Sequence, residues 1–125
     1  MKKWLIIPLF TCGLLSCGGS DKPKESTDTT AIKNISDNPD YKKGFDLVAG
    51  SDCFTCHNID DALTGPAYRV VAEKYNNDDT TITRLANSII NGSSGIWGVT
   101  KMTAHPSVSL DDAKQMVKYI MLLKK

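Results

Sequence analysis

The stretch Cys53-Phe54-Thr55-Cys56-His57 decides how the rest of this 125-residue chain can fold. Its two cysteines are three residues apart, and residues at that spacing lie on the same face of one helical turn. Two thiols placed in this way can form thioether bonds with the two vinyl groups on one porphyrin edge. His57 follows on the same turn, so that its imidazole can reach the iron. The spacing C-x-x-C-H therefore predicts one covalently attached haem c, with Cys53 and Cys56 as attachment points and His57 as an iron ligand.

Three other interpretations of these five residues stay open but explain less. A thioredoxin-like dithiol also uses C-x-x-C, yet no alternating pattern of strands and helices surrounds this one. A structural zinc site would need two more ligands, and the only candidates after Cys56 are His57 and His105. Two buried cysteines beside an ordinary histidine would bring three reactive side chains together by accident. The haem interpretation accounts for all three side chains at once.

The N-terminus has the pattern of an export signal. Met1-Lys2-Lys3 is positively charged, and Trp4 to Leu15 is an apolar run that is too short to span a membrane. The run ends in Leu14-Leu15-Ser16-Cys17, which resembles the lipobox of bacterial lipoproteins, in which the cysteine is acylated and becomes the new N-terminus. We therefore expect residues 1–16 to be a lipoprotein signal peptide and Cys17 to be a lipid anchor. The alternative is cleavage by an ordinary signal peptidase, which would leave Cys17 as a free thiol.

Charge and cysteine usage exclude some classes of protein. The full chain has 15 Lys and Arg side chains and 14 Asp and Glu side chains, and removing Lys2 and Lys3 leaves 13 basic ones, a balance of −1. This balance argues against nucleic acid as a partner. Cys12 would leave with the signal peptide, so that each remaining cysteine has a role and no disulfide is expected.

Residues 17–38 are predicted to be the lipidated cysteine followed by a flexible polar tether. From Gly18 to about Ser36, Ile32 and Ile35 are the only large apolar residues, so that this segment cannot bury a core. About twenty residues of such chain have a reach near 25 Å. The folded domain is expected at residues 39–125, where fewer than 90 residues give a thin core.

The hydrophobic pattern of residues 39–125 predicts an all-α domain of about four short helices. Asn38-Pro39-Asp40 is typical of a helix start, and Gly50 and Asn91-Gly92 are typical of helix ends with a left-handed glycine. Gly44 inside the first helix suggests the close approach of a bulky neighbour. The loop from Ser93 to Val108 is long, and such loops are usually functional. The expected helices, each with apolar residues at helical spacing, are Pro39 to Ala49, Ala67 to Tyr75, Thr81 to Ile90, and a last one that Ser109 opens and that runs to about Leu123.

Iron held by one histidine needs a second axial ligand, and this ligand decides the function. Met116 and Met121 fall on the apolar stripe of the last helix and are expected in the core. Met102 lies in the long loop, outside any helical face, and we predict it to be the second iron ligand. His105 is the rival, although an exposed loop histidine before Pro106 is the simpler interpretation.

Several segments resemble, in the same order, the small bacterial class I cytochromes c. The resemblance runs from Asp40 to Lys124 and includes Cys53 to His57, Met102, Gly65-Pro66-Ala67-Tyr68, Ile90-Asn91-Gly92 and Gly95-Ile96-Trp97-Gly98. It implies a fold of a few helices wrapped around one haem, with the first and last helices crossing. At that crossing, Gly44 and Phe45 would meet Tyr119.

The same resemblance implies roles for two further residues. The Pro66 carbonyl would accept a hydrogen bond from the other ring nitrogen of His57, which fixes the orientation of the ligand. The indole N–H of Trp97 would bond a haem propionate. The sequence departs from the family at Thr100-Lys101-Met102-Thr103, where close relatives often carry prolines around the methionine. This difference predicts a less rigid ligand loop, with the same ligand.

By this resemblance we expect an electron-transfer protein and not an enzyme. It would be a monomeric mono-haem c-type cytochrome that carries one electron between redox proteins of a respiratory chain. Cys17 would hold it on the periplasmic side of a bacterial membrane. The alternative is a haem peroxidase or gas sensor in which Met102 dissociates, with His105 as the one candidate for a distal acid or base. A purely structural lipoprotein would leave the C-x-x-C-H motif unused.

Overall fold

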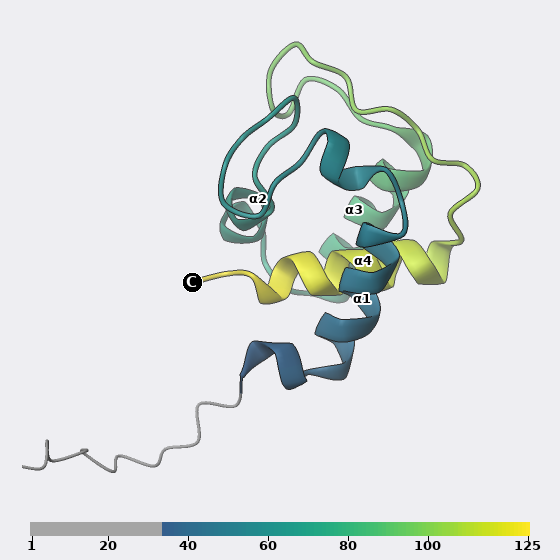
Figure 1. Cartoon of the computed structure of the whole chain (residues 1–125). Helices are drawn as coiled ribbons and strands as arrows, with labels where there is room; N and C mark the ends of the chain where they lie inside the picture. The colour runs from purple at the N-terminus through teal and green to yellow at the C-terminus, as the bar shows by residue number, and fades with distance from the viewer. Residues whose placement is uncertain (1–33) are drawn as a thin grey trace, which may run out of the picture. The chain divides into compact units, whose positions relative to one another are not determined.

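The structure is a computed structural model that describes residues 34–125, and Figure 1 shows their arrangement. The elements in this range are η1 (Ile35–Asp37), α1 (Pro39–Ala49), η2 (Cys53–Thr55), α2 (Tyr68–Lys74), α3 (Asp79–Asn91) and α4 (Leu110–Leu122), where η marks a short 3₁₀ helix. No strand is formed within residues 34–125, and the expected all-α domain with four helices is confirmed.

The expected signal peptide, the Cys17 anchor and most of the tether lie outside the described residues. Of the expected tether, only residues 34–38 are described, and Ile35–Asp37 form a 3₁₀ turn in which the Asp37 amide donates to the Asn34 carbonyl at 2.7 Å. None of the described helices has the length and apolar character needed to cross a membrane.

Side chains at two predicted positions cap the first and last helices. The Asn38 Oδ1 accepts from the amide of Asp40 at 2.8 Å, with a proline at the first helical position of α1. The Ser109 Oγ accepts from the amide of Asp112 at 3.1 Å at the start of α4. These bonds satisfy amides that have no partner inside the helix, which explains why both helices start where the sequence indicates.

Two helix ends differ from the sequence-based expectation. Asp78 caps α3 by accepting from the Thr81 amide at 2.8 Å, so that this helix begins at Asp79, two residues before the expected start. Gly92 ends α3 with the expected left-handed backbone, at φ 76°. Gly50 does not, because its φ of −76° continues the right-handed turn and its amide still bonds a carbonyl of α1.

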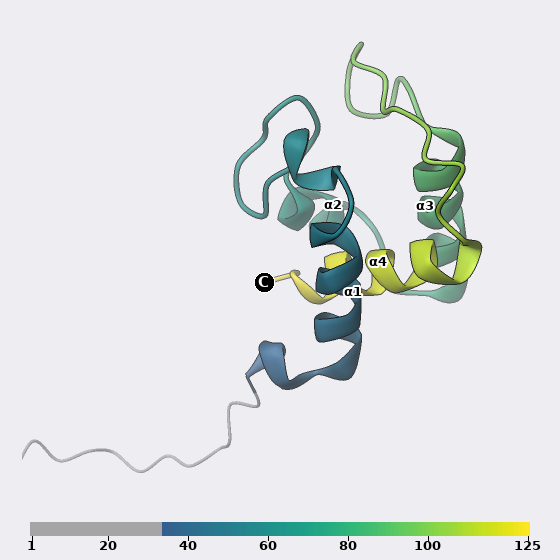
Figure 2. The same ribbon diagram turned by 45° about the vertical axis from the view of Figure 1, so that its right-hand side comes forward.

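The first and last helices cross, as Figures 1 and 2 show, and Gly44 lies at the contact. A Cβ atom on Gly44 would lie 2.5 Å from the carbonyl oxygen of Gln115 and closer still to the Cβ of Tyr119. The rings of Tyr41 and Phe45 pack edge-on against Tyr119, with centroids at 5.0 and 5.8 Å. The expected meeting of Gly44 and Phe45 with Tyr119 is therefore confirmed, and glycine is what lets the two helices touch.

Gly44→Ala is expected to lower the free energy of unfolding by about 2 kcal/mol, since overpacking at a rigid contact costs about 1–3 kcal/mol. The gain in helix propensity of about 1 kcal/mol does not compensate, because the clash involves a backbone carbonyl. Denaturant unfolding of the haem-loaded protein measures this difference. Lys42→Ala on the exposed side of α1 is the control and should stay within about 0.5 kcal/mol of wild type. A Gly44→Ala protein as stable as wild type would mean that the crossing can relax.

The apolar core lies along α4. One cluster of buried residues joins α4 to α1 and α2, and a second joins it to α3. Met116 and Met121 are 2% and 3% exposed, so that both methionines of α4 are core residues as expected. The connections on either side of α2 and α3, residues 50–67 and 92–109, rise on the same side of α4 in Figure 1, and Figure 2 shows them apart.

Candidate functional site

A cavity of about 560 Å³ is lined by both of these connections and by α4. In Figure 2, residues 50–67 (teal) and 92–109 (green) lie apart from one another, with α4 below them. Met116, Val117 and Ile120 contribute the apolar part of the wall that comes from α4. All the site residues predicted within the described range line this one cavity, namely Cys53, Cys56, His57, Pro66, Trp97 and Met102.

The cavity suits a haem in size and in chemistry. Its volume lies within the range of about 300–1,000 Å³ that is typical of cofactor sites, and such sites combine apolar walls with a few convergent polar groups. Within residues 34–125, no three His, Cys, Asp or Glu side chains gather as ligands of a metal ion. The zinc interpretation of C-x-x-C-H therefore finds no ligand set in this part of the chain.

The C-x-x-C-H segment folds as a single tight turn. The amides of Cys56 and His57 both donate to the carbonyl of Cys53, at 3.2 and 3.0 Å. Burial and the negative charge of Asp52 raise the pKa of the Cys53 thiol, against a lowering effect of the Tyr68 hydroxyl. A protonated, half-buried thiol is a poor nucleophile in disulfide exchange, which argues against the dithiol interpretation.

The imidazole of His57 is held on three sides. Its Nδ1 lies 2.7 Å from the carbonyl oxygen of Pro66, and because a carbonyl can only accept, Nδ1 carries the hydrogen. The ring of Tyr68 stacks on the imidazole, with centroids at 5.1 Å and planes 15° apart. A Cβ on Gly65 would strike the imidazole and lie 2.8 Å from Nδ1. These contacts leave the Nε2 lone pair available, the arrangement that a metal-binding histidine requires.

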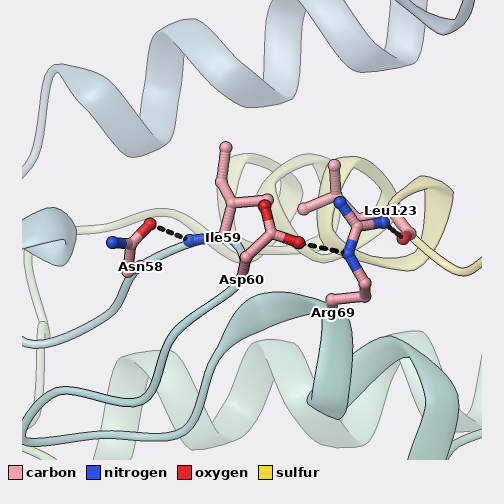
Figure 3. A network of polar contacts seen from close by, with 5 residues as sticks. All are labelled: Asn58, Ile59, Asp60, Arg69 and Leu123. Atoms are coloured by element: carbon pink, nitrogen blue, oxygen red, sulfur yellow. Dashed lines mark hydrogen bonds and ion pairs between the residues drawn. The ribbon is translucent and has the colours of Figure 1, made fainter.

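Figure 3 shows how the segment that follows His57 is fixed to α2 and α4. The Arg69 Nε donates to the Asp60 carboxylate at 2.6 Å, and the Arg69 Nη1 donates to the carbonyl of Leu123 after α4. The Asn58 side chain accepts from the amide of Ile59 at 2.6 Å. The hydrogen bond from Arg69 lowers the pKa of Asp60. Because Asp60 is exposed, this ion pair contributes little to stability, and its role is to hold the chain in place.

The backbone of Met102 is paired with Ser93, two residues after the end of α3. Its amide donates to the carbonyl of Ser93 at 2.9 Å, and the Ser93 Oγ lies 4.0 Å from the Met102 sulfur. Gly92 precedes this pair with a φ of 76°, and a Cβ at that position would lie 2.7 Å from the Met102 carbonyl oxygen. Gly92 is therefore needed both to end α3 and to let the methionine loop pass.

Trp97 lies at the exposed rim of the cavity. Its ring packs edge-on against Tyr75 with centroids at 6.3 Å, and the Lys74 Nζ lies 5.0 Å above it. The side chain is 36% exposed and also lines the cavity. These contacts hold the indole beside the cavity mouth, next to a positive charge.

Sequence reasoning missed two contacts of this site. The stacking of Tyr68 on His57 has a weak signal, an aromatic residue directly after the Gly65-Pro66-Ala67 segment. The second contact joins the His105 Nε2 to the Asp52 carboxylate at 2.9 Å, across 53 residues. Nothing local in the sequence pairs these two residues. The expectation that His105 is exposed was wrong, because its side chain is only 21% exposed and lines the cavity.

Comparisons with known proteins agree with this geometry. The sequence matches the family model described as cytochrome c over residues 41–124. Cytochrome c-552 of Nitrosomonas europaea is 39% identical over 79 residues, which cover 63% of this chain and 77% of that protein. Cytochrome c-551 of Pseudomonas denitrificans is 37% identical over 81 residues, which cover 65% of this chain and 98% of that protein.

The fold agrees as well. The crystal structure of wild-type Nitrosomonas europaea cytochrome c552 matches with a TM-score of 0.61 and 39% identity, and the match covers 64% of this chain and 99% of that one. The matched region includes the crossing helices, the C-x-x-C-H turn and the methionine loop. With its cavity lined by these segments and residues 41–124 matched by the family model, this chain belongs to the cytochrome c family and has the class I cytochrome c fold.

Proposed function

We propose that this chain is a one-electron carrier between redox proteins of a respiratory chain, anchored by lipid on the periplasmic side of a bacterial membrane. Members of its family carry one covalently attached haem c and transfer electrons, and they are not enzymes. One observation carries the proposal most strongly. A single cavity is lined by the C-x-x-C-H motif and by a methionine from a loop far along the chain.

In this proposal Cys53 and Cys56 would hold the haem covalently, and His57 and Met102 would be the two protein ligands of the iron. The haem, when bound, supplies a one-electron couple of ferric and ferrous iron. The hydrogen bond from the His57 Nδ1 to the Pro66 carbonyl fixes the imidazole and keeps Nε2 free to ligate. The Met102 thioether raises the reduction potential relative to a second nitrogen ligand.

The surroundings of the cavity favour the ferrous state. Met116, Val117 and Ile120 exclude water from one side, and an apolar wall disfavours the additional positive charge of ferric iron. Trp97 is proposed to donate its indole N–H to a haem propionate from the cavity rim. Redox partners would contact the protein at this rim through a small interface, and small interfaces suit rapid exchange of partners.

The alternative function, a peroxidase or gas sensor with a dissociable Met102, has less support. Such a protein needs a distal acid or base, and among the described residues His105 is the candidate. The His105 Nε2 is already bonded to the Asp52 carboxylate at 2.9 Å. A role in holding the loop explains this geometry without catalysis.

The proposed anchor rests on the sequence alone. Leu14-Leu15-Ser16-Cys17 resembles a lipobox, and several acyl chains on Cys17 would hold the protein at the bilayer far longer than one. A tether from Gly18 to Ser36 would keep the domain near the membrane and raise its effective concentration for membrane-bound partners towards the millimolar range. The mature domain is proposed to act as a monomer and not to bind nucleic acid.

Replacing Cys17 by serine tests the carrier and the anchor separately. Cys17→Ser, exported with an ordinary signal peptide, should be a soluble cytochrome with an unchanged spectrum and a single one-electron wave in a potentiometric titration. Its electron transfer to membrane-bound partners should fall about tenfold or more, because the effective concentration is lost. Membrane fractionation, the lipid mass on Cys17 and stopped-flow reduction measure these effects.

Two results would count against the proposal in different ways. Wild-type protein in the soluble fraction with no lipid mass on Cys17 would refute the anchor and leave a freely diffusing carrier. Rapid carbon monoxide binding by the reduced wild-type protein would instead favour the sensor or peroxidase.

A further inference from the structure

The bond between His105 and Asp52 joins the methionine loop to the haem-attachment turn. The His105 Nε2 lies 2.9 Å from the Asp52 Oδ1. Asp52 precedes Cys53 directly, and its carbonyl accepts from the Thr55 amide at 3.0 Å, so that its backbone is part of the η2 turn. The side-chain bond therefore connects two cavity-lining segments that are otherwise separate in the chain.

The backbone of His105 is fixed as firmly as its side chain. Its amide donates to the carbonyl of Ile89 in α3 at 3.0 Å, and its carbonyl accepts from the amide of Val108 at 3.0 Å. Pro106 follows and restricts His105 to an extended backbone. A residue held to α3 by its backbone and to η2 by its side chain sets the distance between these two elements.

This position matters for Met102 because the rest of the loop is not stiff. No proline occurs between Ser93 and His105, and Gly95 and Gly98 in the loop have φ values of 84° and 108°. Met102 is paired to Ser93 on one side, and His105 follows three residues later. The two attachments at the base of the loop therefore confine the methionine between them.

We infer that Asp52 and His105 are positioning residues that hold the Met102 loop against the Cys53 turn and thereby keep the sixth coordination position of the iron closed. The inference rests on the proposed ligation by His57 and Met102. A carboxylate can only accept, so Nε2 is the donor.

Three variants separate this hydrogen bond from a general structural effect. Asp52→Ala and His105→Ala should each speed carbon monoxide binding to the ferrous protein roughly threefold to tenfold, the factor expected for loss of one partly exposed hydrogen bond to a carboxylate. In the ferric state, the methionine-to-iron charge-transfer band should disappear at a lower temperature than in wild type. Asp52→Asn should behave like wild type, because the amide oxygen still accepts from Nε2. The double alanine variant should match the single ones, because all remove the same bond.

Asp61→Ala is the matched control. Asp61 lies in the segment after the Cys53 turn, and its exposed carboxylate makes no hydrogen bond with residues 34–125. Asp52 is 74% exposed, so Asp52→Ala should not impair folding, and circular dichroism verifies this. The inference would be overturned if both alanine variants bound carbon monoxide at the wild-type rate and lost the methionine band at the wild-type temperature. It would also be overturned if Asp61→Ala had the same effect as Asp52→Ala. A wild-type protein that lacks the methionine band would instead contradict the proposed ligation itself.

Discussion

A chain in which Cys53 and Cys56 are both replaced by alanine is expected to contain no covalent haem and to lose most of its helical circular dichroism. The two thiols lie on the turn that lines the cavity, and no other described cysteine can replace them. Without thioether bonds the cofactor is held only by its axial ligands and can dissociate. The folded state then loses the stabilisation that a bound group provides.

The size of the cavity explains why the expected effect is so large. The cavity has a volume of about 560 Å³ and is lined by α4 and by both connections, so that without the haem its apolar walls would lose their packing partner and face water. The whole stability of a small domain is about 5–15 kcal/mol. The helices around α4 are therefore not expected to keep their packing when the cavity is empty. Far-UV circular dichroism and the ratio of haem to protein absorbance measure the two effects.

Thr55→Ala is the matched control for the double cysteine variant, because Thr55 lies on the same turn and is exposed. It should retain full haem content and helicity. A double cysteine variant with normal helicity and no haem would contradict the argument that the domain depends on its cofactor. Thiol-disulfide exchange activity in the wild-type apoprotein would restore the dithiol interpretation.

Met102→Ala is expected to remove the weak methionine-to-iron charge-transfer band of the ferric protein completely. The ferrous protein should then bind carbon monoxide, and the reduction potential should fall, because the thioether that favours ferrous iron is gone. The absorption spectrum of the oxidised protein, a titration with carbon monoxide and a potentiometric titration measure these three effects. The fold should persist, because Met102 lies in a loop and is held through its backbone amide.

Met121→Leu provides the comparison for this variant. Met121 is a buried methionine of α4 that does not line the cavity, and exchange for leucine conserves its volume. Met121→Leu should keep the methionine-to-iron band and, like wild type, should not bind carbon monoxide. Its free energy of unfolding should change by less than about 1.5 kcal/mol. If Met102→Ala kept the band, a methionine other than Met102 would be the ligand, and the assignment of Met102 would be wrong.

The sequence predicts those features of the fold that local chemistry determines. Asn38 and Ser109 are residues whose side chains cap helices, and α1 and α4 begin directly after them. The family resemblance predicted the position of Gly44 at the helix crossing, and the crossing is confirmed by the contact with Tyr119. The turn around Cys53 follows from the spacing of its residues, because the amides of the next turn bond its carbonyl.

The sequence did not predict two local helix ends and one contact between residues that are distant along the chain. The start of α3 was placed two residues too late because Asp78, within a polar run, gave no clear sign that it would cap. Gly50 was expected to be left-handed, but its φ of −76° continues the right-handed turn, and its amide bonds the carbonyl of Asp46 at 2.8 Å. The bond from Asp52 to His105 spans 53 residues and has no local pattern at all.

The pairing of Met102 with Ser93 also has a practical consequence for engineering. It closes the loop at its base, and beyond it Gly98 and Val99 reach a tip that does not line the cavity, where Val99 is 99% exposed. Exposed loop tips tolerate inserted sequence, and each doubling of loop length costs only about 0.6 kcal/mol in closure entropy. A fluorescent reporter or an affinity peptide spliced between these two residues would sit near the redox centre without pulling on the methionine.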